Sequence, residues 1–404
     1  MTSYLSVLKT PGVTRIIVAQ LTARFPFGML SLAFLLHIER IHHSYGAAGL
    51  VLAAMSIGQA IAGPMTSRLM GVLGMRMVLW STLIVCSAAI SVIGALIMPL
   101  ATTMIVAFVA GLSMPPIQSA VRTIYPKLVN SKQLTTLFSL DASAQEIIWI
   151  AGPVIITFVS TQAGTTEGIL MAVAILLAGG AWFISSPEVG RVRIPRSKRR
   201  FGAVLTRPPV LLATVVSFLM LAACSGIEAG VVSSFGEGSA MAGIVLGLWS
   251  LGSLIGGFSF GHRPMGPWAT ARRMLVVFIG VFLAIFFTWS WFGLTASLII
   301  SGLGIAPAFA VIFAMVSASV KFSDTAEAFG WVGTGQLIGA ALGSALAGFL
   351  IDAHGPIGAF IVAAGFAFFG FVVAALGHRL LPDLREGDAS PIPDTEPVAA
   401  VHLS

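Results

Sequence analysis

Long apolar stretches alternate with short polar segments along this sequence. The hydrocarbon core of a bilayer is about 30 Å thick, so a helix needs roughly 20 apolar residues to cross it. Stretches of that length have their cores at 15–38, 45–67, 76–98, 102–125, 140–162, 166–186, 208–232, 240–261, 271–292, 295–319, 327–351 and 356–380. A strand barrel would show short segments of alternating hydrophobicity instead. The pattern predicts an all-α integral membrane protein with twelve transmembrane helices.

Composition supports this class, because 57% of the 404 residues are hydrophobic and only 9% are charged. Soluble domains average about 25% charged residues, so this chain could not cover a surface that faces water. Cys86 and Cys224 both lie inside apolar stretches. This position favours buried small hydrophobic side chains over a disulfide or a metal site.

Lysine and arginine are concentrated in alternate connections between the predicted helices, and the opposite connections hold only Arg40. Because cytoplasmic loops carry the excess of these residues, both termini are predicted to be cytoplasmic. Arg24 is left over inside the first helix. The basic connections contain the run at 191–200 together with Lys9, Arg15, Arg68, Arg76, Arg122, Lys127, Lys132, Arg207, Arg263, Arg272, Arg273, Lys321, Arg379 and Arg385.

The basic run "RVRIPRSKRR" at 191–200 divides the chain near its midpoint. We interpret it as a topology determinant beside anionic lipid, with nucleic-acid binding as a poor alternative. The predicted organisation is an N-terminal six-helix half (1–186), a basic cytoplasmic linker (187–207), a C-terminal six-helix half (208–381) and a tail (382–404). The tail is Pro-rich and acidic, so we expect it to be disordered. The N-terminus lacks a cleavage site and is interpreted as a cytoplasmic stub.

One short sequence is written twice. "AAGLVLAAMSIGQAIAGP" from Ala47 resembles "MAGIVLGLWSLGSLIGGF" from Met241, with a shift of 194 residues. Two further pairs keep the same order: "VLKTPGV" and "VLTRPPV" precede helices 1 and 7, and "GLSMPP" and "GLGIAP" lie within helices 4 and 10. Each half then contains six helices, which predicts two parallel halves related by an axis along the membrane normal.

The connection after helix 2, "GPMTSRLMGVLGMRMVL", resembles the signature between helices 2 and 3 of the major facilitator superfamily. The matching residues are Gly63, Pro64, Arg68, Leu69, Gly74 and Arg76. Ser67 stands in place of a glycine, Gly71 in place of the aspartate and Val72 in place of an arginine. The second half has a degenerate copy, "GGFSFGHRPMG", with Gly257 and Gly261.

Two more motifs carry the resemblance. In helix 5, "WIAGPV" contains Gly152 and Pro153, like the Gly-Pro of the motif associated with antiporters, although the flanking glycines are missing. In helix 4, "AFVAGL" resembles a motif that usually begins with an arginine, here Ala107. The resemblance covers essentially the whole chain and implies the fold of that superfamily. It also implies that helices 2 and 8 face each other across the interface between the halves.

In the superfamily the missing aspartate joins a cytoplasmic charge network that holds the outward-facing state closed. Without it, Arg68 and Arg76 need another anion. Asp324 and Glu327, at the expected start of helix 11, are candidates for that gating role. Acids there also suit a helix N-terminus, so the alternative is a pair of solvated interfacial side chains.

Ionisable side chains inside a membrane cost roughly 2.5–3.5 kcal/mol to insert, so each needs a partner or an aqueous cavity. The resemblance places helices 1, 4 and 5 around the cavity of the first half, where Arg24 and Glu146 could pair. Such a pair would leave a carboxylate able to exchange a proton; the alternative is a static packing pair. Asp141 is either functional or the start of helix 5. Glu228 either faces the extracytoplasmic mouth or snorkels to the interface.

The amides of Gln118 and Gln336 are further candidates. They could bind substrate, or they could form hydrogen bonds between helices. Trp149 follows Glu146 by three residues and could stack on a ligand, or pack against lipid. In span 11, Gly335, Gly339 and Gly343 recur every four residues, a spacing that lets helices approach closely. The crowded "HIERIHH" at 37–43 lacks the spacing of a zinc helix, and we expect a wet loop there rather than a metal site.

These features predict a secondary active transporter that works by alternating access, not an enzyme. The chain has no nucleotide-binding loop, and no hydrolase or metalloprotease motif. Proton-coupled export of a small amphipathic compound is the leading interpretation, supported by the resemblance to bacterial efflux permeases. Uptake of a sugar or another nutrient is the alternative, and a membrane enzyme or receptor-like protein is remote. We expect no cofactor, a monomer in the bacterial cytoplasmic (inner) membrane, and no nucleic-acid partner.

Overall fold

The computed structural model describes residues 4–236, 240–260, 265–385 and 389–394. These residues are almost entirely helical, and twelve helical segments are long and apolar enough to cross a membrane, as predicted. The spans are α2–α3 (Val13–Arg24 and Phe27–His42), α4 (Tyr45–Leu73), α5 (Met75–Ala95), α6–α7 (Leu100–Leu112 and Ile117–Leu128), α8 (Ser131–Gln162), α9 (Thr165–Ser185), α11 (Pro208–Phe235), α12 (Ala240–Phe260), α13 (Ala269–Phe286), α14 (Trp291–Ser319), α15 (Phe322–His354) and α16 (Pro356–Leu376).

Two of the spans are interrupted where proline breaks the helical hydrogen bonding. Pro26 separates α2 from α3, and Pro115 with Pro116 separates α6 from α7. Proline has no backbone N–H and clashes with the preceding turn, so each break is set by the sequence itself. Four short helices lie outside the spans: α1 (Tyr4–Leu8), α10 (Pro187–Arg191), η1 (Ala203–Thr206) and η2 (His378–Leu380).

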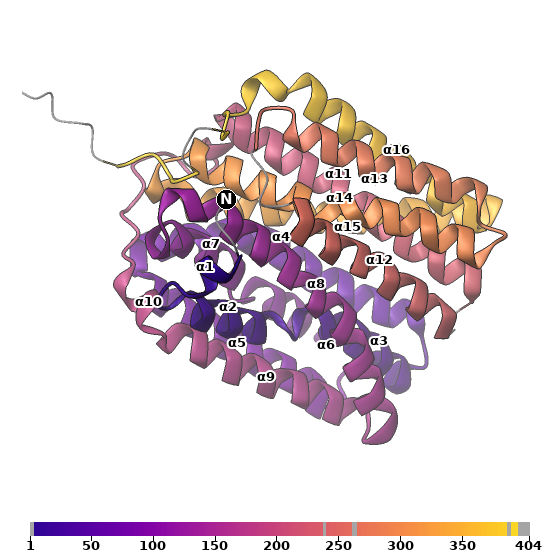
Figure 1. Cartoon of the computed structure of the whole chain (residues 1–404). Helices are drawn as coiled ribbons and strands as arrows, with labels where there is room; N and C mark the ends of the chain where they lie inside the picture. Colours follow the sequence, from indigo (N-terminus) through magenta and orange to yellow (C-terminus); the bar gives the residue numbers. More distant parts are fainter. Residues whose placement is uncertain (1–3, 237–239, 261–264, 386–388, 395–404) are drawn as a thin grey trace, which may run out of the picture.

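The twelve spans form two bundles that lie side by side (Figure 1). α2 to α9 form the N-terminal half, and α11 to α16 form the C-terminal half. Between the halves, α4 packs against α15 and α12 packs against α8. In span numbers, these are the contacts of span 2 with span 11 and of span 8 with span 5. Spans 2 and 8 are equivalent in the two halves, and so are spans 5 and 11, so each contact is the repeat of the other. This is the relationship expected for parallel halves with an axis along the membrane normal.

The duplicated sequence builds the same helix contact in each half. An added Cβ at Gly58 in α4 would lie 2.9 Å from Leu112 N of α6, and one at Gly111 would lie 2.9 Å from Gln59 N. Gly252 in α12 and Gly302 in α14 form the equivalent close contact, because an added Cβ at Gly302 would lie 3.2 Å from the carbonyl carbon of Gly252. Small residues allow this close approach where lipid supplies no hydrophobic drive between helices.

The prediction that helices 2 and 8 face each other is wrong. α4 packs against α6 and α15, while α12 packs against α14 and α8. α4 and α12 do not lie beside the axis that relates the halves, and each meets a non-equivalent helix of the other half. The repeat is therefore a contact within each half as well as a surface toward the other.

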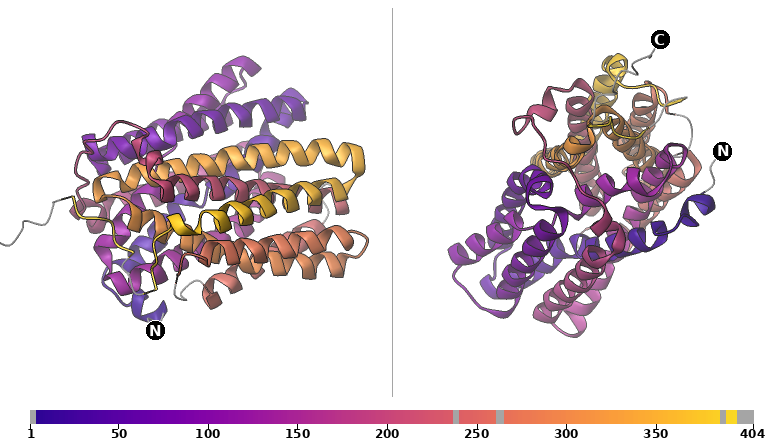
Figure 2. Two further views of the ribbon diagram at one scale, coloured as in Figure 1. Left: turned by 90° about the horizontal axis from the view of Figure 1, so that it is seen from above. Right: turned by 90° about the vertical axis from the view of Figure 1, so that its left-hand side faces the viewer.

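One end of the bundle carries Arg68, Arg76 and the linker, and we call it the basic end. The first helix and the last described residues also lie there (Figure 2). Hydrogen bonds join the two halves near this end: Ser139 Oγ and the Tyr4 hydroxyl donate to Gly257 O at 3.0 and 2.9 Å, and Thr334 Oγ1 donates to Ala60 O at 2.9 Å. The halves are thus held together at the basic end.

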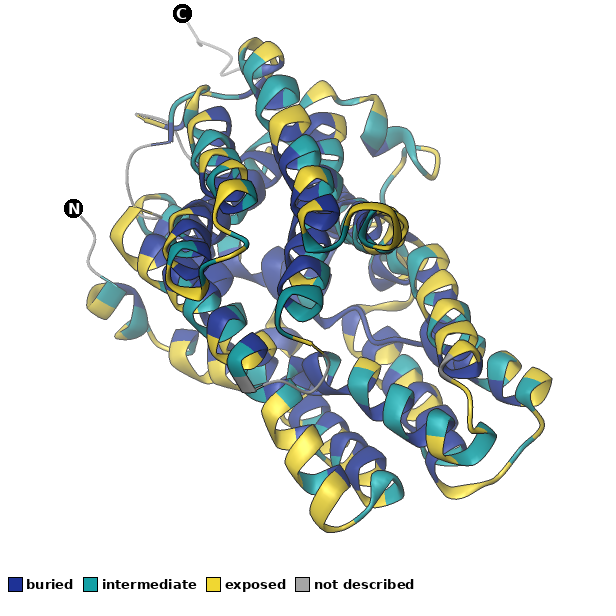
Figure 3. Ribbon diagram, turned by 90° about the vertical axis from the view of Figure 1, so that its right-hand side faces the viewer, coloured by how far each residue is buried: buried dark blue, intermediate teal, exposed yellow. Residues whose placement is uncertain are grey.

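The outward faces of the helices are apolar. Buried residues gather between the helices, and exposed residues lie on the outside of the bundle (Figure 3). Many of these exposed side chains are large and hydrophobic, among them Ile84, Phe349 and Phe369. Such a surface suits the acyl chains of a bilayer, which are as apolar as these side chains.

The short helix α10 is tied to the first span by an ion pair. Arg15 bonds to both carboxylate oxygens of Glu188, with Nε donating to Oε2 at 3.2 Å. Burial alone would raise the pKa of Glu188, but the hydrogen bond and charge of Arg15 outweigh it, and the pKa lies below its ordinary value. The contact fixes the end of the N-terminal half where the linker begins.

The described part of the tail differs from the disorder expected for it. Ile392 bonds through its backbone to Val320 and Phe322, and Ser323 N donates to Asp394 Oδ1 at 3.3 Å. Leu384 and Ala389 are buried. Apolar side chains in this acidic segment give it a surface to pack with, which its composition did not reveal. Gly261, Arg263 and residues 395–404 fall outside the described residues.

Candidate functional site

A buried carboxylate is the centre of a polar network in the N-terminal half. Asp141 in α8 is fully buried. It accepts hydrogen bonds from Gln20 Nε2 at 3.1 Å, Arg122 Nε at 3.1 Å and the Tyr125 hydroxyl at 3.0 Å. Arg24 NH1 lies 3.5 Å from the same carboxylate. Spans 1, 4 and 5 therefore meet at Asp141.

The predicted pairing of Arg24 with Glu146 is wrong. Arg24 bonds instead to Gln20 Oε1 at 2.8 Å and Gln145 Oε1 at 2.5 Å, beside Asp141. Asp141 and Gln145 are one turn apart and share the face of α8 that meets the first span, whereas Glu146 points to the next face around the helix. The alternative that Asp141 starts the helix is also wrong, because α8 begins at Ser131.

Arg122 is the residue that the sequence interpretation missed. It was assigned to the basic connections, yet it is 1% exposed and pairs with Asp141. Its guanidinium carbon lies 3.4 Å from the ring centre of Phe313 in α14 and 5.9 Å from that of Phe329 in α15. A cation over an aromatic face is attracted by the ring quadrupole. Arg122 therefore links the network to the C-terminal half.

Gln118 completes the surroundings of Arg122. It lies one turn earlier in α7, and with its amide oxygen toward the guanidinium it accepts hydrogen bonds at 2.8 and 2.6 Å. This orientation of the amide follows from the hydrogen-bonding network around it. The cluster holds two arginines and one aspartate, so it has one uncompensated positive charge, shared among the amides and rings.

Glu146 lies where the two halves meet. Its carboxylate accepts a hydrogen bond from Ser253 Oγ of α12 at 2.9 Å, and the same hydroxyl accepts from Ala306 N of α14 at 3.2 Å. Ala306 precedes Pro307, which interrupts the hydrogen bonding of α14. In the described part of the chain Glu146 has no ion pair. One carboxylate thus joins span 5 to spans 8 and 10 without a compensating cation.

Two further candidates lie near Glu146. Glu228 of α11 is exposed and within electrostatic range of Glu146. Trp149 of α8 is 49% exposed. On a helix with about 3.6 residues per turn, Trp149 projects between the directions of Gln145 and Glu146. Gln336 of α15 is partly exposed.

At the basic end, both acids that were predicted to replace the missing aspartate form ion pairs. Arg68 NH1 donates to Glu327 Oε2 at 2.7 Å, as proposed from the sequence. Asp324 pairs instead with Arg199 of the linker, at 3.6 Å. Both acids are buried, so the alternative of solvated interfacial side chains is wrong.

Arg76 forms no ion pair with an acid among the residues that the structure describes. Its guanidinium donates to the carbonyls of Ile184 and Ser186, both at 3.1 Å, and so satisfies the end of α9. The last carbonyls of a helix have no partner within the helix, and a cation there is favourable. Gly74, with φ 93°, forms the sharp connection between α4 and α5.

The glycine motifs bring helices into contact. An added Cβ at Gly63 would lie 3.2 Å from Thr334 Oγ1, and Gly330 of α15 abuts Pro64 of α4. In the antiporter-like motif, an added Cβ at Gly152 would lie 2.8 Å from the backbone of Gly28 in α3. Pro153 lies inside the continuous helix α8. This motif sets the crossing of spans 1 and 5.

Three glycines of α15 bring spans 7 and 11 into close contact: Gly335, Gly339 and Gly343. Each faces the backbone of α11, near Thr214, Phe218 and Ala222 respectively. The close approach predicted from their spacing is confirmed.

The histidine-rich segment is helical rather than a loop, because α3 continues to His42. His37 is buried, and its ring bonds to Thr165 Oγ1 at 3.0 Å and Ile93 O at 3.1 Å. Both nitrogens are occupied by structural contacts. Among the residues that the structure describes, no three His, Cys, Asp or Glu side chains are grouped to hold a metal ion.

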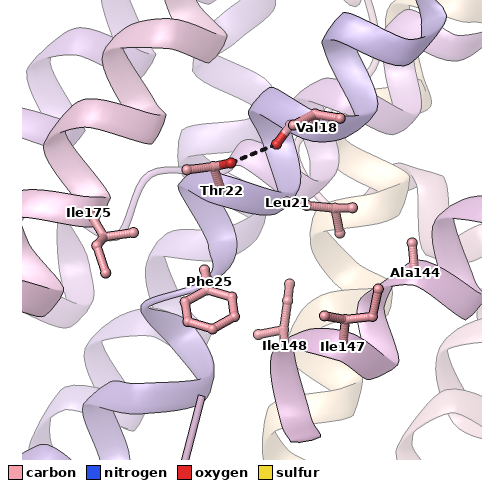
Figure 4. A pocket seen from close by; sticks show the side chains of 8 residues that line it. All are labelled: Val18, Leu21, Thr22, Phe25, Ala144, Ile147, Ile148 and Ile175. Atoms are coloured by element: carbon pink, nitrogen blue, oxygen red, sulfur yellow. Dashed lines mark hydrogen bonds between the residues drawn. The ribbon is translucent and has the colours of Figure 1, made fainter. Parts of the chain in front are cut away.

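A separate apolar cavity of about 260 Å³ lies between spans 1, 5 and 6 (Figure 4). Its lining includes Phe25, Ile147, Ile148 and Ile175, and Thr22 Oγ1 is satisfied by Val18 O at 2.9 Å. Ile147 lies on the face of α8 opposite to Trp149. The cavity therefore contains none of the ionisable candidates.

Comparison with known proteins agrees with this geometry. A family model described as Major Facilitator Superfamily matches residues 16–293 and 233–400. The chain therefore belongs to the major facilitator superfamily, and it is a transporter rather than an enzyme. No curated protein matches the sequence.

Solved transporters share the fold at low sequence identity. A bacterial homologue of the iron transporter ferroportin, in the outward-facing state, has a TM-score of 0.75 at 13% identity, over 90% of this chain and 98% of that one. The E. coli fucose:proton symporter FucP has a TM-score of 0.68 at 14% identity, over 91% and 99%. The proton:xylose symporter XylE has a TM-score of 0.71 at 11% identity, over 89% and 94%.

Proposed function

We propose that this transporter exports a small amphipathic compound in exchange for protons, with Glu146 as the residue that carries the proton. The two halves rock about the contacts of α4 with α15 and of α8 with α12. The state described here is closed at the basic end, which we take to be cytoplasmic because basic residues are concentrated there. The membrane is proposed to be the bacterial cytoplasmic membrane, and the working unit a monomer.

The position of Glu146 is the observation that carries this proposal. A carboxylate at membrane depth is costly unless it is paired, hydrated or functional. Glu146 has a serine hydroxyl of the opposite half as its hydrogen-bond partner and no cation. Separation of α8 from α12 would remove that hydrogen bond and change the surroundings of the carboxylate. The charge of Glu146 is thereby coupled to the movement of the halves.

Amphipathic substrates are supported by the side chains near Glu146. Trp149 offers an exposed aromatic face, and Glu228 offers a second carboxylate from the other half. An aromatic ring with unpaired acids suits a compound that has an apolar body and a positive charge. Export is favoured by the Gly152-Pro153 motif of span 5, which resembles that of antiporters.

Uptake of a sugar is the second candidate, because FucP and XylE, both described as proton symporters of sugars, share this fold. A sugar site would need several hydrogen-bonding side chains, and the described surroundings of Glu146 and Trp149 offer few.

Transport assays in cells separate these candidates. Cells that produce the protein are loaded with ethidium, a lipophilic cation, and its efflux is followed; uptake of fucose and xylose is measured in parallel. We expect faster ethidium efflux than in cells with Glu146→Gln, and no sugar uptake. Sugar accumulation with unchanged ethidium efflux would favour the symporter alternative and overturn export.

A further inference from the structure

The linker between the halves is part of the closure at the basic end. Ser197 Oγ donates to Asp324 Oδ1 at 2.5 Å, and Gly202 N donates to Glu327 Oε1 at 2.7 Å. Arg68 donates to Arg199 O, so the arginine that pairs with Glu327 also holds the linker. The linker thus bonds to both acids in the first two turns of α15 and to the arginine of α4.

Gly71 makes room for this segment. An added Cβ at Gly71 would lie 3.2 Å from Pro195 O and 3.5 Å from Ile194 Cγ2. Gly71 stands where the superfamily signature has an aspartate, and a carboxylate there would meet a carbonyl oxygen at close range. Ile194 is buried against this position. The linker can therefore take this course only because a glycine replaces the aspartate of the signature.

The linker has a second face. Residues 192–198 form neither helix nor strand, and the side chains of Ile194, Ser197 and Arg199 contact the rest of the protein. The intervening basic side chains are exposed, and in the described part of the chain they form no ion pair. They are Arg193, Arg196, Lys198 and Arg200. Four cations are thus presented outward by a segment whose other face holds the gate.

Side chains typical of the membrane surface lie beside this face. The rings of Phe201 and Trp331 are in contact in a tilted arrangement, with centres 5.7 Å apart, and Phe201 is 49% exposed. Aromatic side chains are enriched where the bilayer meets water. Leu69 and Leu73, at the end of α4 beside the linker, are exposed apolar side chains of a lipid-facing helix. In a bilayer, this setting would bring phospholipid headgroups close to the four cations.

We propose that the linker is a lipid-sensitive latch, in which the outward cations bind anionic phospholipid headgroups while the inward residues hold the basic end closed. Basic residues close to an anionic surface are attracted by its potential. When the basic end opens, α4 and α15 separate, and the inward contacts cannot all be kept. Anionic lipid, by holding the linker in its closed-state position, shifts the population toward closure.

The test measures the closed population directly. Spin labels are attached at Leu73→Cys and Leu380→Cys, exposed positions of the two halves at the basic end, with Cys86 and Cys224 replaced by alanine. Distances are recorded in phosphatidylcholine liposomes with and without roughly 30 mol% phosphatidylglycerol. We expect anionic lipid to raise the ratio of closed to open protein about fivefold, the effect of one basic residue at a charged surface.

Two variants locate the effect. Neutralising Arg193, Arg196, Lys198 and Arg200 to glutamine should abolish the lipid response, whereas neutralising Lys9, Arg207, Arg272 and Arg379 should leave it. Gly71→Leu keeps every charge but displaces the linker, so it should also lose the response, while Val72→Leu should keep it. A wild-type protein that ignores phosphatidylglycerol, or a Gly71→Leu or quadruple variant that responds normally, would overturn the latch.

This proposal rests on alternating access but not on the coupling ion or the substrate, since the distances are measured without either. If Arg68→Gln opens the basic end but lipid has no effect, the latch fails and alternating access stands.

Discussion

Arg68 near the end of α4 and Glu327 near the start of α15 form an ion pair of 2.7 Å across the two halves. Glu327 is 1% exposed, and the side chain of Arg68 is 23% exposed. Loss of Arg68 leaves the buried carboxylate of Glu327 without its cation, which costs more than the pair itself contributes, and loss of Glu327 removes the charge that holds the partly buried Arg68. This relationship makes the pair a determinant of the state that is closed at the basic end.

Removing either charge should open that end. Ser67→Cys introduces a thiol at a fully buried position beside Gly330, so its reaction with a maleimide reports opening. We expect Arg68→Gln or Glu327→Gln to accelerate the reaction about five- to a hundredfold, which corresponds to roughly 1–3 kcal/mol. The double variant should be no faster than the singles. Unchanged reactivity in both singles would show that the pair does not hold the halves together.

Asp141 should be a determinant of stability. Asp141→Asn removes the single carboxylate that compensates Arg24 and Arg122. We expect a destabilisation of about 3–5 kcal/mol, seen as a lower melting temperature of the purified protein. Arg24→Gln in the same chain should restore part of the loss. The matched variant Gln133→Asn, on the same helix near its exposed start, should melt like the wild type; equal melting of Asp141→Asn would contradict this role.

The paired glycines predict position-specific effects within one helix. At Gly252 of α12 an added Cβ would lie 2.7 Å from Ile299 O, whereas at Gly247 it would meet nothing within 4 Å. Gly252→Ala should therefore lower the melting temperature. Gly247→Ala should leave it unchanged or raise it, because alanine favours a helix over glycine by about 1 kcal/mol. Equal effects of the two substitutions would mean that close packing of α12 with α14 is not limiting.

The Arg15–Glu188 pair predicts a dependence on pH. The pKa of Glu188 is lowered in the folded protein, so its contribution to stability is present above the ordinary value of about 4.3 and is lost as pH falls through the folded pKa. Glu188→Gln should therefore melt at a lower temperature than the wild type at neutral pH. The difference should shrink as the pH is lowered below about 4. A difference independent of pH would exclude ionisation as its source.

The sequence predicted the spans because a bilayer imposes one length on every apolar helix. It also predicted that Arg68 needs an anion and that Glu327 could supply it, since few acids lie near that end. The rotation of each helix about its axis was not predictable. It depends on contacts such as Gly28 with Gly152, and that rotation decides that Asp141, rather than Glu146, faces Arg24.

The burial of Arg122 and the contacts of the linker were missed for a related reason. From the sequence alone, a basic residue near the end of a span looks the same whether its side chain is solvated or buried. Its burial follows from the turn of α7 after the Pro115–Pro116 break, which directs Arg122 toward Phe313. The extended linker has no helical or apolar periodicity, and its contacts with Asp324 and Glu327 arise only when both halves are assembled.

Proton coupling through Glu146 is the central claim, and flux in proteoliposomes tests it most directly. Purified protein is reconstituted, ethidium is added, and accumulation is recorded after a pH gradient is imposed. The wild type and the control Glu39→Gln should concentrate ethidium in response to the gradient, whereas Glu146→Gln should bind ethidium but show no gradient-driven accumulation. Accumulation by Glu146→Gln equal to that of the wild type would contradict the account.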